Sequence, residues 1–589
     1  MKCIKFSCCI LIALSFIFAL EPVKANLEPL PKLRDDENIN QSVLPIPYLG
    51  GCQSPGVQIG ITTYDVQSYG SFGQRIVVKD NNQVHVDWMW CNGPYPPSPR
   101  QIAWNFRYPD GSWYGETLIA PSISGYCQLD ITRDVIPDSQ RTVICYHYYT
   151  GPFYSWIDIE PFGNPSSPMI DGYLWPHIAC TENGNIIVAT GDRDADMHHL
   201  HITTDEGNTW TGIADFDSCR LLSHDLCASH NSDKVVFVHT QFITDSIAGG
   251  EEDNNVWYMS STDGGLTWGS HTNLTNYQPY PTDSVRAYSN VNAIFDMNDN
   301  LHIAWTGKRV TDTYWPASKI FHWDEVNDTI TIVSSPSIYY PEPGGWWIYT
   351  AIMAPGAWRM PADEPQLVVD STNNDLYCLW LGNDDYSDTS AAGYFNGEIF
   401  ASKSTDNGLT WTDYANLTNT RTPGAPAGAC EDEDYMTAHP FVVNDSIYIT
   451  YIEDKDAGAF PNTEGIMTTN PVRCWVFHKD LIPGIKEKNT LKNGYTTPIL
   501  EVYPNPFKEK AEIRCTIHDT RYMMNDYSLK IFDATGQLIK QFNHLTNQPF
   551  NQVTWDGYDN TGKKPPSGVY FLEFETSDYV ETKKLILLR

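Results

Sequence analysis

Residues 203–210, 261–268 and 404–411 read TTDEGNTW, STDGGLTW and STDNGLTW. Each string carries a hydroxyl residue, an aspartate two positions later, a glycine two positions after that, and a closing Thr-Trp pair. A pattern this specific, present three times in one chain, indicates a structural unit that is used repeatedly.

Three residues of each string have separate physical roles. The Asp carboxylate can accept hydrogen bonds from turn amides, the Gly can take a positive φ, and the Trp can pack between neighbouring sheets. Turn chemistry explains these residues without a ligand, so we assign them to folding. They are Asp205, Gly207, Trp210, Asp263, Gly265, Trp268, Asp406, Gly408 and Trp411.

Around these strings, an apolar strand, a polar turn and a second alternating strand recur at intervals of roughly 50 to 75 residues. Residues 176–189 and 292–305 are two such copies. Period-two alternation predicts hairpins, and repeated four-stranded units predict an all-β chain folded as a β-propeller, whose edges are hidden by radial closure. We count seven modules between residues 70 and 480; because the second module is the weakest, six blades stay an alternative.

The three strings resemble the Asp-box, or bacterial neuraminidase repeat, of sialidase-like propellers. The resemblance implies that each box lies at the turn between the third and fourth strands of its blade. It also implies that the boxes lie on the face away from the ligand.

The C-terminal part of the chain differs from the repeats. A polar stretch over residues 481–497 predicts a linker, and residues 498–589 predict a small immunoglobulin-like β-sandwich. Residues 502–507, 566–571 and 583–589 read VYPNPF, PSGVYF and KKLILLR. In this order they resemble the C-terminal sorting domain of type IX secretion cargo. The resemblance implies the type IX machinery as a partner, and secretion or delivery to the outer surface of a Gram-negative bacterium via the periplasm.

At the N-terminus, basic residues precede an apolar run from Ile10 to Leu20. We predict a signal peptide over residues 1–25, a segment over residues 26–69 that leads into the propeller, and no transmembrane segment after the peptide is removed. The 72 acidic against 38 basic residues give a net charge of −34. This charge repels phosphates, so we expect no nucleic-acid partner.

Three of the 14 cysteines lie in the predicted signal peptide, and the others would meet an oxidising compartment, where disulfides persist. Cys219 with Cys227, and Cys127 with Cys145, are close enough in sequence to close short loops, although spacing alone does not fix the pairing. None shows C-x-x-C spacing, which argues against a zinc site built on thiolates.

In a propeller, the loops after the second strands and those entering the next blade converge on one face, where pockets form. In these loops we expect ligand-binding residues, because rings can stack on sugars while Arg and Asp fix polar groups. They are Tyr173, Trp175, Asp192, Arg193, Arg220, Arg286 and Arg309. Asp192, Asp194 and Asp196 occupy every second position, as the carboxylate ligands of a Ca²⁺-binding loop do, so a Ca²⁺ site is possible here.

A sialidase would also need a Tyr nucleophile and an acid. Tyr288 or Tyr435 would supply the first and Asp194 or Asp196 the second, with no spacing that selects among them. Leu174 stands where the resembled family has the first arginine of its carboxylate clamp. The favoured hypothesis is therefore a surface propeller that binds complex glycans or cell-surface polymers. The alternatives are a glycoside hydrolase of the exo-sialidase type and a non-catalytic adhesion or structural protein.

Overall fold

The chain divides into two compact units, Met1–Lys486 and Glu487–Arg589. The computed structural model describes residues 53–95, 98–120, 123–133, 136, 139–149, 153–159, 170–171, 173–192, 197–217, 219–243, 254–278, 282–283, 285–309, 317–333, 347–348, 359–383, 385, 387–482, 499–505, 507–508, 510–516, 528–533, 538–542, 550–575 and 580–588. The predicted signal peptide and nearly all of the predicted linker lie outside these ranges.

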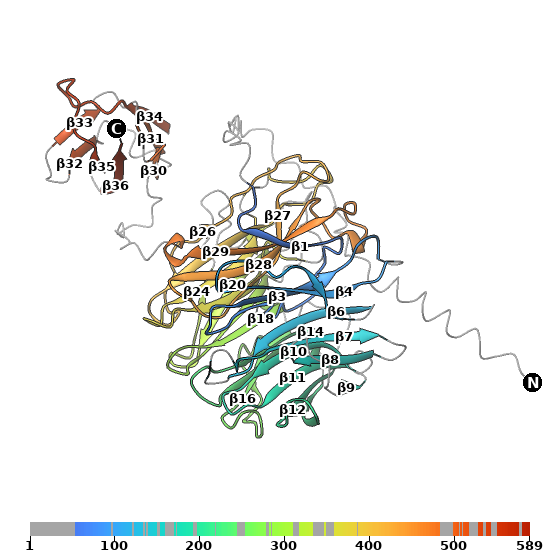
Figure 1. Ribbon diagram of the computed structural model, residues 1–589. Coiled ribbons are helices and arrows are strands. Elements are labelled where there is room, and N and C mark those ends of the chain that lie inside the picture. The colour runs from blue at the N-terminus through green and yellow to red at the C-terminus, as the bar shows by residue number, and fades with distance from the viewer. Residues whose placement is uncertain are drawn as a thin grey trace, which may run out of the picture. The chain divides into compact units, whose positions relative to one another are not determined.

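The described part of the first unit consists of antiparallel sheets in which most strands pair with the next strand in the chain (Figure 1). The first sheet contains β2 (Ile76–Val78), β3 (Val84–Trp90), β4 (Gln101–Arg107) and β5 (Thr117–Leu118). The second contains β6 (Ser124–Ile131), β7 (Thr142–Tyr149), β8 (Phe153–Ile159) and β9 (Ile170–Asp171). The third contains β10 (Leu174–Cys180), β11 (Ile186–Asp192), β12 (Met197–Thr203) and β13 (Thr211–Phe216). The last two contain β23 (Ala362–Val369), β24 (Leu376–Gly382), β25 (Glu398–Ser404) and β26 (Ala415–Asn416); and β27 (Asp432–Ala438), β28 (Ser446–Asp454), β29 (Asn470–His478) and β1 (Val57–Thr62).

Between these lies a nine-stranded sheet that is two units joined by one residue pair, Asn254 with Ala287. Its strands are β14 (Cys219–Ala228), β15 (Val235–Phe242), β16 (Asn254–Ser261) and β17 (Thr272–Asn273), then β18 (Val285–Phe295), β19 (Leu301–Arg309), β20 (Ala317–Asp324), β21 (Thr329–Ile332) and β22 (Trp347–Ile348). Divided at this pair, the described strands fall into seven units. This grouping favours seven blades over six, and the blade number stays a prediction.

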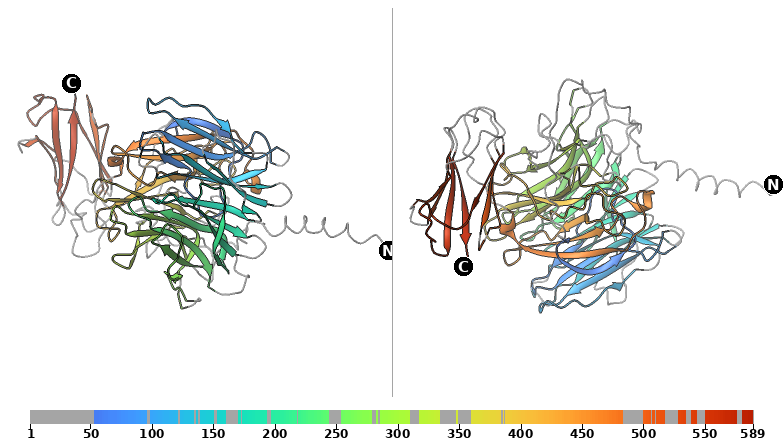
Figure 2. Two further views of the ribbon diagram at one scale, coloured as in Figure 1. Left: turned by 60° about the horizontal axis from the view of Figure 1, so that its bottom comes forward. Right: turned by 90° about the horizontal axis from the view of Figure 1, so that it is seen from above.

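The first strand of each unit lies on the inside. Strand β6 contacts β2 and β10, β14 contacts β10 and β18, and β23 contacts β18 and β27. The strands of the last unit lie beside those of the first, as the orange and blue ribbons of Figure 2 show. Such a ring of inner strands is the arrangement of a β-propeller, and it confirms the predicted fold class.

The ring closes through the N-terminal strand. Strand β1 pairs with β29 of the last unit, with Val57 opposite Cys474 and Thr62 opposite Asn470. The outer edge of the last unit is therefore supplied by the beginning of the described chain.

Most inner strands carry a break in register near their beginning. It occurs in β6, β10, β14, β18, β23 and β27. At four of these breaks a non-glycine residue takes a left-handed backbone: Tyr126, Trp175, Glu364 and Tyr435 have φ of 54°, 51°, 53° and 53°. Such conformations are uncommon for large residues, and they re-aim these side chains within the sheet.

The three repeated strings form the turns that join β12 to β13, β16 to β17 and β25 to β26. The Oδ1 atoms of Asp205, Asp263 and Asp406 accept the backbone N–H four positions later at 2.9, 2.8 and 2.9 Å. Gly207, Gly265 and Gly408 take φ of 83°, 85° and 81°.

These turns pack on the preceding unit. A Cβ built on Gly265 would lie 2.8 Å from the Ile187 side chain, and one on Gly408 would lie 2.0 Å from the His322 ring. The Nε1 of Trp411 donates to Thr331 Oγ1 of β21 at 3.2 Å. The turns therefore help to hold neighbouring units together.

The described cysteines do not show the pairings that their spacing suggested. Cys127 and Cys145 are buried and form no disulfide with each other, and Cys227 forms none with Cys219. Each lies within or beside the strands of the propeller, where a buried cysteine behaves as a small apolar residue.

The second unit is a β-sandwich of two sheets in its described residues. One contains β30 (Ile499–Tyr503), β31 (Ala511–Thr516) and β34 (Phe550–Trp555). The other contains β32 (Ser528–Asp533), β33 (Leu538–Phe542), β35 (Gly568–Glu575) and β36 (Val580–Leu587). Its core is formed by Trp555, Tyr570, Leu572, Phe574 and Leu585 with their neighbours. This agrees with the predicted sandwich.

The described residues contain two complete 3₁₀ turns, at Phe460–Asn462 and Lys479–Leu481, and one further 3₁₀ residue, Ser139. Neither has the length or the apolar composition that a membrane-spanning helix needs, and the rest of the described chain contains no such helix.

Candidate functional site

Part of the predicted ligand face lies outside the described residues. This holds for Arg193, Asp194 and Asp196 and for the side chain of Arg220, whose backbone belongs to β14. Of the three predicted Ca²⁺ ligands, the structure therefore describes only Asp192.

Tyr173 and Asp192 lie beside one histidine of β12. The Tyr173 ring centroid lies 4.3 Å from that of His199. His199 Nδ1 lies 2.6 Å from Asp215 Oδ1, and its Nε2 lies 3.8 Å from Asp192 Oδ2. Two predicted ligand residues thus share an imidazole that the sequence analysis did not propose.

Trp175 and Tyr435 lie near the axis instead. Trp175 lines a pocket together with Phe72 and Arg75. The Tyr435 ring centroid lies 5.7 Å from that of Phe72. Both residues belong to inner strands and both take the left-handed backbone described above.

The remaining predicted residues lie on β18 and β19. Tyr288 and Arg286 are buried in β18, and Arg286 Nη1 donates to the carbonyl oxygens of Asp283 and Val285 at 3.2 and 2.7 Å. Arg309 ends β19. The described predicted residues are therefore placed in three regions of the propeller.

The axial pocket is filled largely by the protein itself. The segment over residues 63–74, which links β1 to β2, has no regular secondary structure, yet most of its side chains are buried. Ser71 Oγ donates to the Ser289 carbonyl of β18 at 3.2 Å, and the Phe72 carbonyl accepts from Gln366 Nε2 of β23 at 2.8 Å. We call residues 63–74 the axial segment, since it contacts the inner strands of several units.

Two arginines that the sequence analysis did not propose lie at this axis. Arg75 donates to Gln67 Oε1 and to the Gln67 carbonyl at 2.7 and 2.6 Å, and its guanidinium carbon lies 4.4 Å from the Phe72 ring. Arg359 forms a bidentate ion pair with Asp434. The axial segment and neighbouring strands therefore supply partners for both cations.

Burial controls the ionisation of the axial acids. It raises the pKa of Glu364 to about 8, although Arg359 lowers it, and it raises the pKa of the Tyr435 hydroxyl well above its ordinary value of 10.0. Both side chains are almost completely inaccessible to solvent. They are accordingly protonated at neutral pH.

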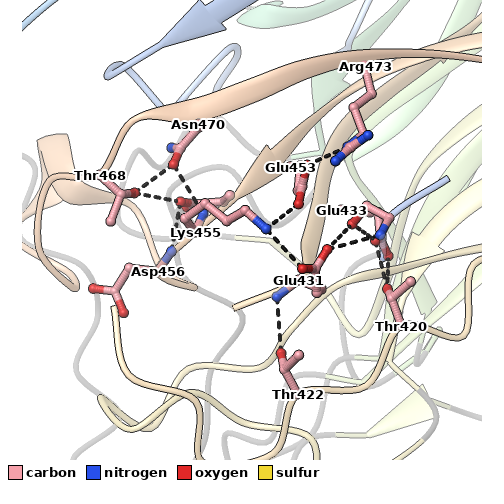
Figure 3. Close-up of polar contacts among 12 residues, drawn as sticks. Thr420, Thr422, Glu431, Glu433, Glu453, Lys455, Asp456, Thr468, Asn470 and Arg473 are labelled. Carbon is pink, nitrogen blue, oxygen red and sulfur yellow. Dashed lines mark hydrogen bonds and ion pairs between the residues drawn. The ribbon is translucent and has the colours of Figure 1, made fainter. Parts of the chain in front are cut away.

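A network of acidic residues ties the N-terminal residues to the last unit. Figure 3 shows Lys455 pointing toward Glu431 and Glu453, with Lys455 Nζ 3.0 Å from Glu431 Oε1. Ser54 Oγ donates to Glu431 Oε2 at 2.8 Å, and Arg473 pairs with Glu453. Because these carboxylates already have cationic or hydroxyl partners inside the protein, the network serves to anchor the chain.

Asp432, Asp434 and Asp454 lie close enough together for one carboxylate oxygen of each to bind a single cation. However, Arg359 already pairs with Asp434. The pKa values of both Asp432 and Asp454 lie well above the ordinary value. Burial is the largest cause, and repulsion by neighbouring carboxylates is the second. Protonation and the ion pair with Arg359 reduce the repulsion among these three carboxyl groups.

An open cavity of about 250 Å³ lies where β12, β13 and β15 end or begin. We call it the β12–β15 pocket. It is lined by Met197, Asp215, Phe216, Asp217, Gln241 and His271. Asp215, which lines this pocket, also contacts His199, and His199 in turn contacts Tyr173 and Asp192. The pocket therefore adjoins part of the predicted ligand face.

A row of five histidines runs between the axial pocket and the β12–β15 pocket. His177 lines the first and His271 the second. The consecutive ring centroids of His177, His224, His198, His239 and His271 are 4.2, 4.5, 5.5 and 5.0 Å apart. The three middle rings are completely buried.

The sequence contained one signal for this region that the analysis did not use. Residues 197–201 read MHHLH, and short His-rich tracts are typical of metal binding. Period-two alternation in β12 directs His198 and Leu200 to one side of the sheet and His199 and His201 to the other. The tract therefore contributes to two separate clusters.

Residues 501–588 match the family described as the secretion system C-terminal sorting domain. The C-terminal unit is a type IX sorting domain. This domain directs export of the protein by type IX secretion to the cell surface or the extracellular space, as the terminal motifs predicted. No match was found among the curated proteins.

Solved structures that match this chain include two enzymes that act on carbohydrates and a secretion component. The chain is 13% identical to PorZ, a surface component of the type IX secretion system of Porphyromonas gingivalis, with a TM-score of 0.40, and the match covers 88% of this chain and 60% of PorZ. It is 12% identical to the α-L-arabinofuranosidase Arb93A of Fusarium graminearum, with a TM-score of 0.38 and coverage of 73% and 99%. For an ulvan lyase of family PL25 the identity is 10%, the TM-score 0.44 and the coverage 74% and 100%.

Proposed function

We propose that this exported propeller binds a polysaccharide and that the β12–β15 pocket takes one of its sugar residues. The observation that carries the proposal is the composition of this pocket, in which the rings of Phe216 and His271 meet the carboxylates of Asp215 and Asp217. Small-ligand sites generally combine apolar walls with a few polar anchors in this way.

The lining groups match the two sides of a sugar ring. An aromatic face can pack against its C–H groups, while a carboxylate accepts hydrogen bonds from its hydroxyls and the Gln241 amide can both donate and accept. The side chain of Asp215 is 67% exposed and so is accessible to a ligand. Because both anionic groups would repel an acidic sugar, we infer that the ligand is neutral and rich in hydroxyls.

The same argument disfavours the exo-sialidase alternative at this pocket. Recognition of a sialic acid carboxylate relies on bidentate arginine contacts, and the described lining contains no arginine. Tyr435 and Glu364, which resemble a nucleophile and its partner in residue type, are both buried. Binding therefore has more support than hydrolysis of acidic sugars.

A glycan array with the full mature protein, followed by calorimetry and product analysis on each hit, tests the proposal. We expect binding of neutral glycans without turnover. The Asp217→Ala variant should raise the dissociation constant about tenfold, the usual effect of losing a hydrogen bond to a charged group. The matched control is Asp413→Ala, which removes an exposed aspartate from another unit and should leave affinity unchanged.

Each other outcome has a definite meaning. Binding that Asp217→Ala leaves intact would contradict the assigned pocket. Turnover of a hit would instead support the glycoside hydrolase alternative, and an array without hits would support the adhesion alternative.

A further inference from the structure

We propose that His198, His239 and Cys219 bind one thiophilic transition-metal ion, Zn²⁺ or copper, behind the β12–β15 pocket. One ring nitrogen of each histidine and the Cys219 sulfur all lie within 4.8 Å of one another. The three residues come from β12, β15 and β14, and all are fully buried.

The distances suit a metal. Bonds of about 2.0 Å to nitrogen and about 2.3 Å to sulfur place tetrahedral ligands about 3.5 Å apart. The observed separation between Cys219 Sγ and His239 Nδ1 is 3.3 Å. A small closure of the His198 ring toward this pair would complete three sides of a tetrahedral or trigonal site.

The donor set selects the class of metal. Two imidazoles with one thiolate suit Zn²⁺ and copper, whereas Ca²⁺ and Mg²⁺ require oxygen ligands. The cluster is surrounded by Phe216, Phe237 and Leu200, which exclude water. Such a shell strengthens electrostatic attraction between a thiolate and a cation.

A third buried imidazole lies next to the cluster. The His224 ring centroid lies 4.5 Å from that of His198, and its Nδ1 has no hydrogen-bond partner among the described residues. His224 Nε2 lies 3.1 Å from the Trp175 carbonyl, which fixes the ring. The atoms close enough together to share one ion do not include one from His224, so this ring is a neighbour that supports the site and not one of its ligands.

The neighbouring groups resemble the supports of a metal site. His239 Nε2 lies 2.8 Å from His271 Nε2, and ligand histidines normally bond through their second nitrogen to an outer partner. His271 in turn lines the open β12–β15 pocket, which gives the ion a path from solvent. A purely structural polar cluster would need neither this path nor four adjoining imidazoles.

Cobalt substitution of the full mature protein provides the test. The protein is stripped with a chelator, and Co²⁺ and then Zn²⁺ are added while absorption and bound metal are measured. We expect one equivalent of metal, an intense thiolate-to-cobalt band and displacement of cobalt by zinc. Elemental analysis of the metal that the purified protein retains before stripping distinguishes Zn²⁺ from copper, since copper exceeds zinc in affinity at almost any site with nitrogen and sulfur ligands.

Variants assign the ligands. Cys219→Ser should abolish the thiolate band, and His239→Gln should weaken affinity at least about 100-fold, since loss of even an outer partner costs about 10- to 100-fold. Cys227→Ser, at the far end of β14, is the matched control and should change neither. Absence of the band from wild-type protein would overturn the proposal, and this result does not depend on whether any variant folds. A band that Cys227→Ser removes and Cys219→Ser preserves would also overturn it.

Discussion

The Ser71 hydroxyl accepts a hydrogen bond from the backbone N–H of Val291 at 3.1 Å, although 220 positions separate the two residues. This bond fastens the axial segment to an inner strand that belongs to a distant unit. The segment is thus a part of the propeller core, and the axis is not an open channel at this level.

Replacement of Ser71 tests this role. Ser71→Ala leaves the buried Val291 N–H without its partner, so we expect the free energy of unfolding to fall by about 1–3 kcal/mol. Denaturant unfolding measures the change. Ser112→Ala is the control, because its hydroxyl bonds to Asp110 in an exposed turn and its loss should cost within about 0.5 kcal/mol. Equal effects would mean that the axial segment contributes little to the core.

The packing of the repeated turns can be measured with two glycines. Gly408→Ala places a Cβ 2.0 Å from the buried His322 ring at a φ of 81°. We expect it to destabilise the protein by about 2–4 kcal/mol, the sum of backbone strain and overpacking. Gly424→Ala, at a φ of 72° with open space around it, should cost only about 1 kcal/mol. Thermal unfolding of both variants decides, and equal losses would show that contact with the preceding unit is unimportant.

Glu364 should make stability depend on pH. Because burial raises its pKa from 4.5 to about 8, the folded state retains a proton that the unfolded chain releases. Its contribution to the free energy of unfolding is therefore complete below about pH 4.5 and is lost as pH rises to about 8. Glu364→Gln should flatten the stability curve across this interval. Identical curves for wild type and Glu364→Gln would contradict this explanation.

Deletion of residues 499–589 tests the two-unit organisation. The propeller has its own core and the sandwich has another, so we expect the truncated protein to fold but to accumulate in the periplasm. Cell fractionation and circular dichroism measure the two effects. Surface amounts equal to those of the full chain would contradict the role of the sorting domain in export.

The propeller and the sandwich were predictable because their patterns are local. Alternation and the repeated turn residues Asp263 and Gly265 depend on a few neighbouring positions, and residues 583–587, KKLIL, lie in a single strand. Local patterns of this kind survive in any tertiary context that keeps the strands paired.

The site was harder to predict because contacts between residues far apart in the sequence decide which way its side chains point. The bulge in β10 separates Tyr173 from Trp175, so that one side chain lies beside β12 and the other beside the axis. The axial segment has no periodic pattern, and its burial depends on partners such as Ser289 and Gln366 that follow hundreds of positions later. His198 and Cys219 meet only after two units have packed.

The pairing of β1 with β29 also has a kinetic consequence. Val57 and Cys474 close a loop of roughly 400 residues, a contact of very high sequence separation, and such contacts form slowly. Until they form, β29 presents an unpaired edge to other chains. The interval between synthesis of β29 and its pairing with β1 is therefore the period in which this protein is most exposed to aggregation, and a chaperone that shields β29 would act there.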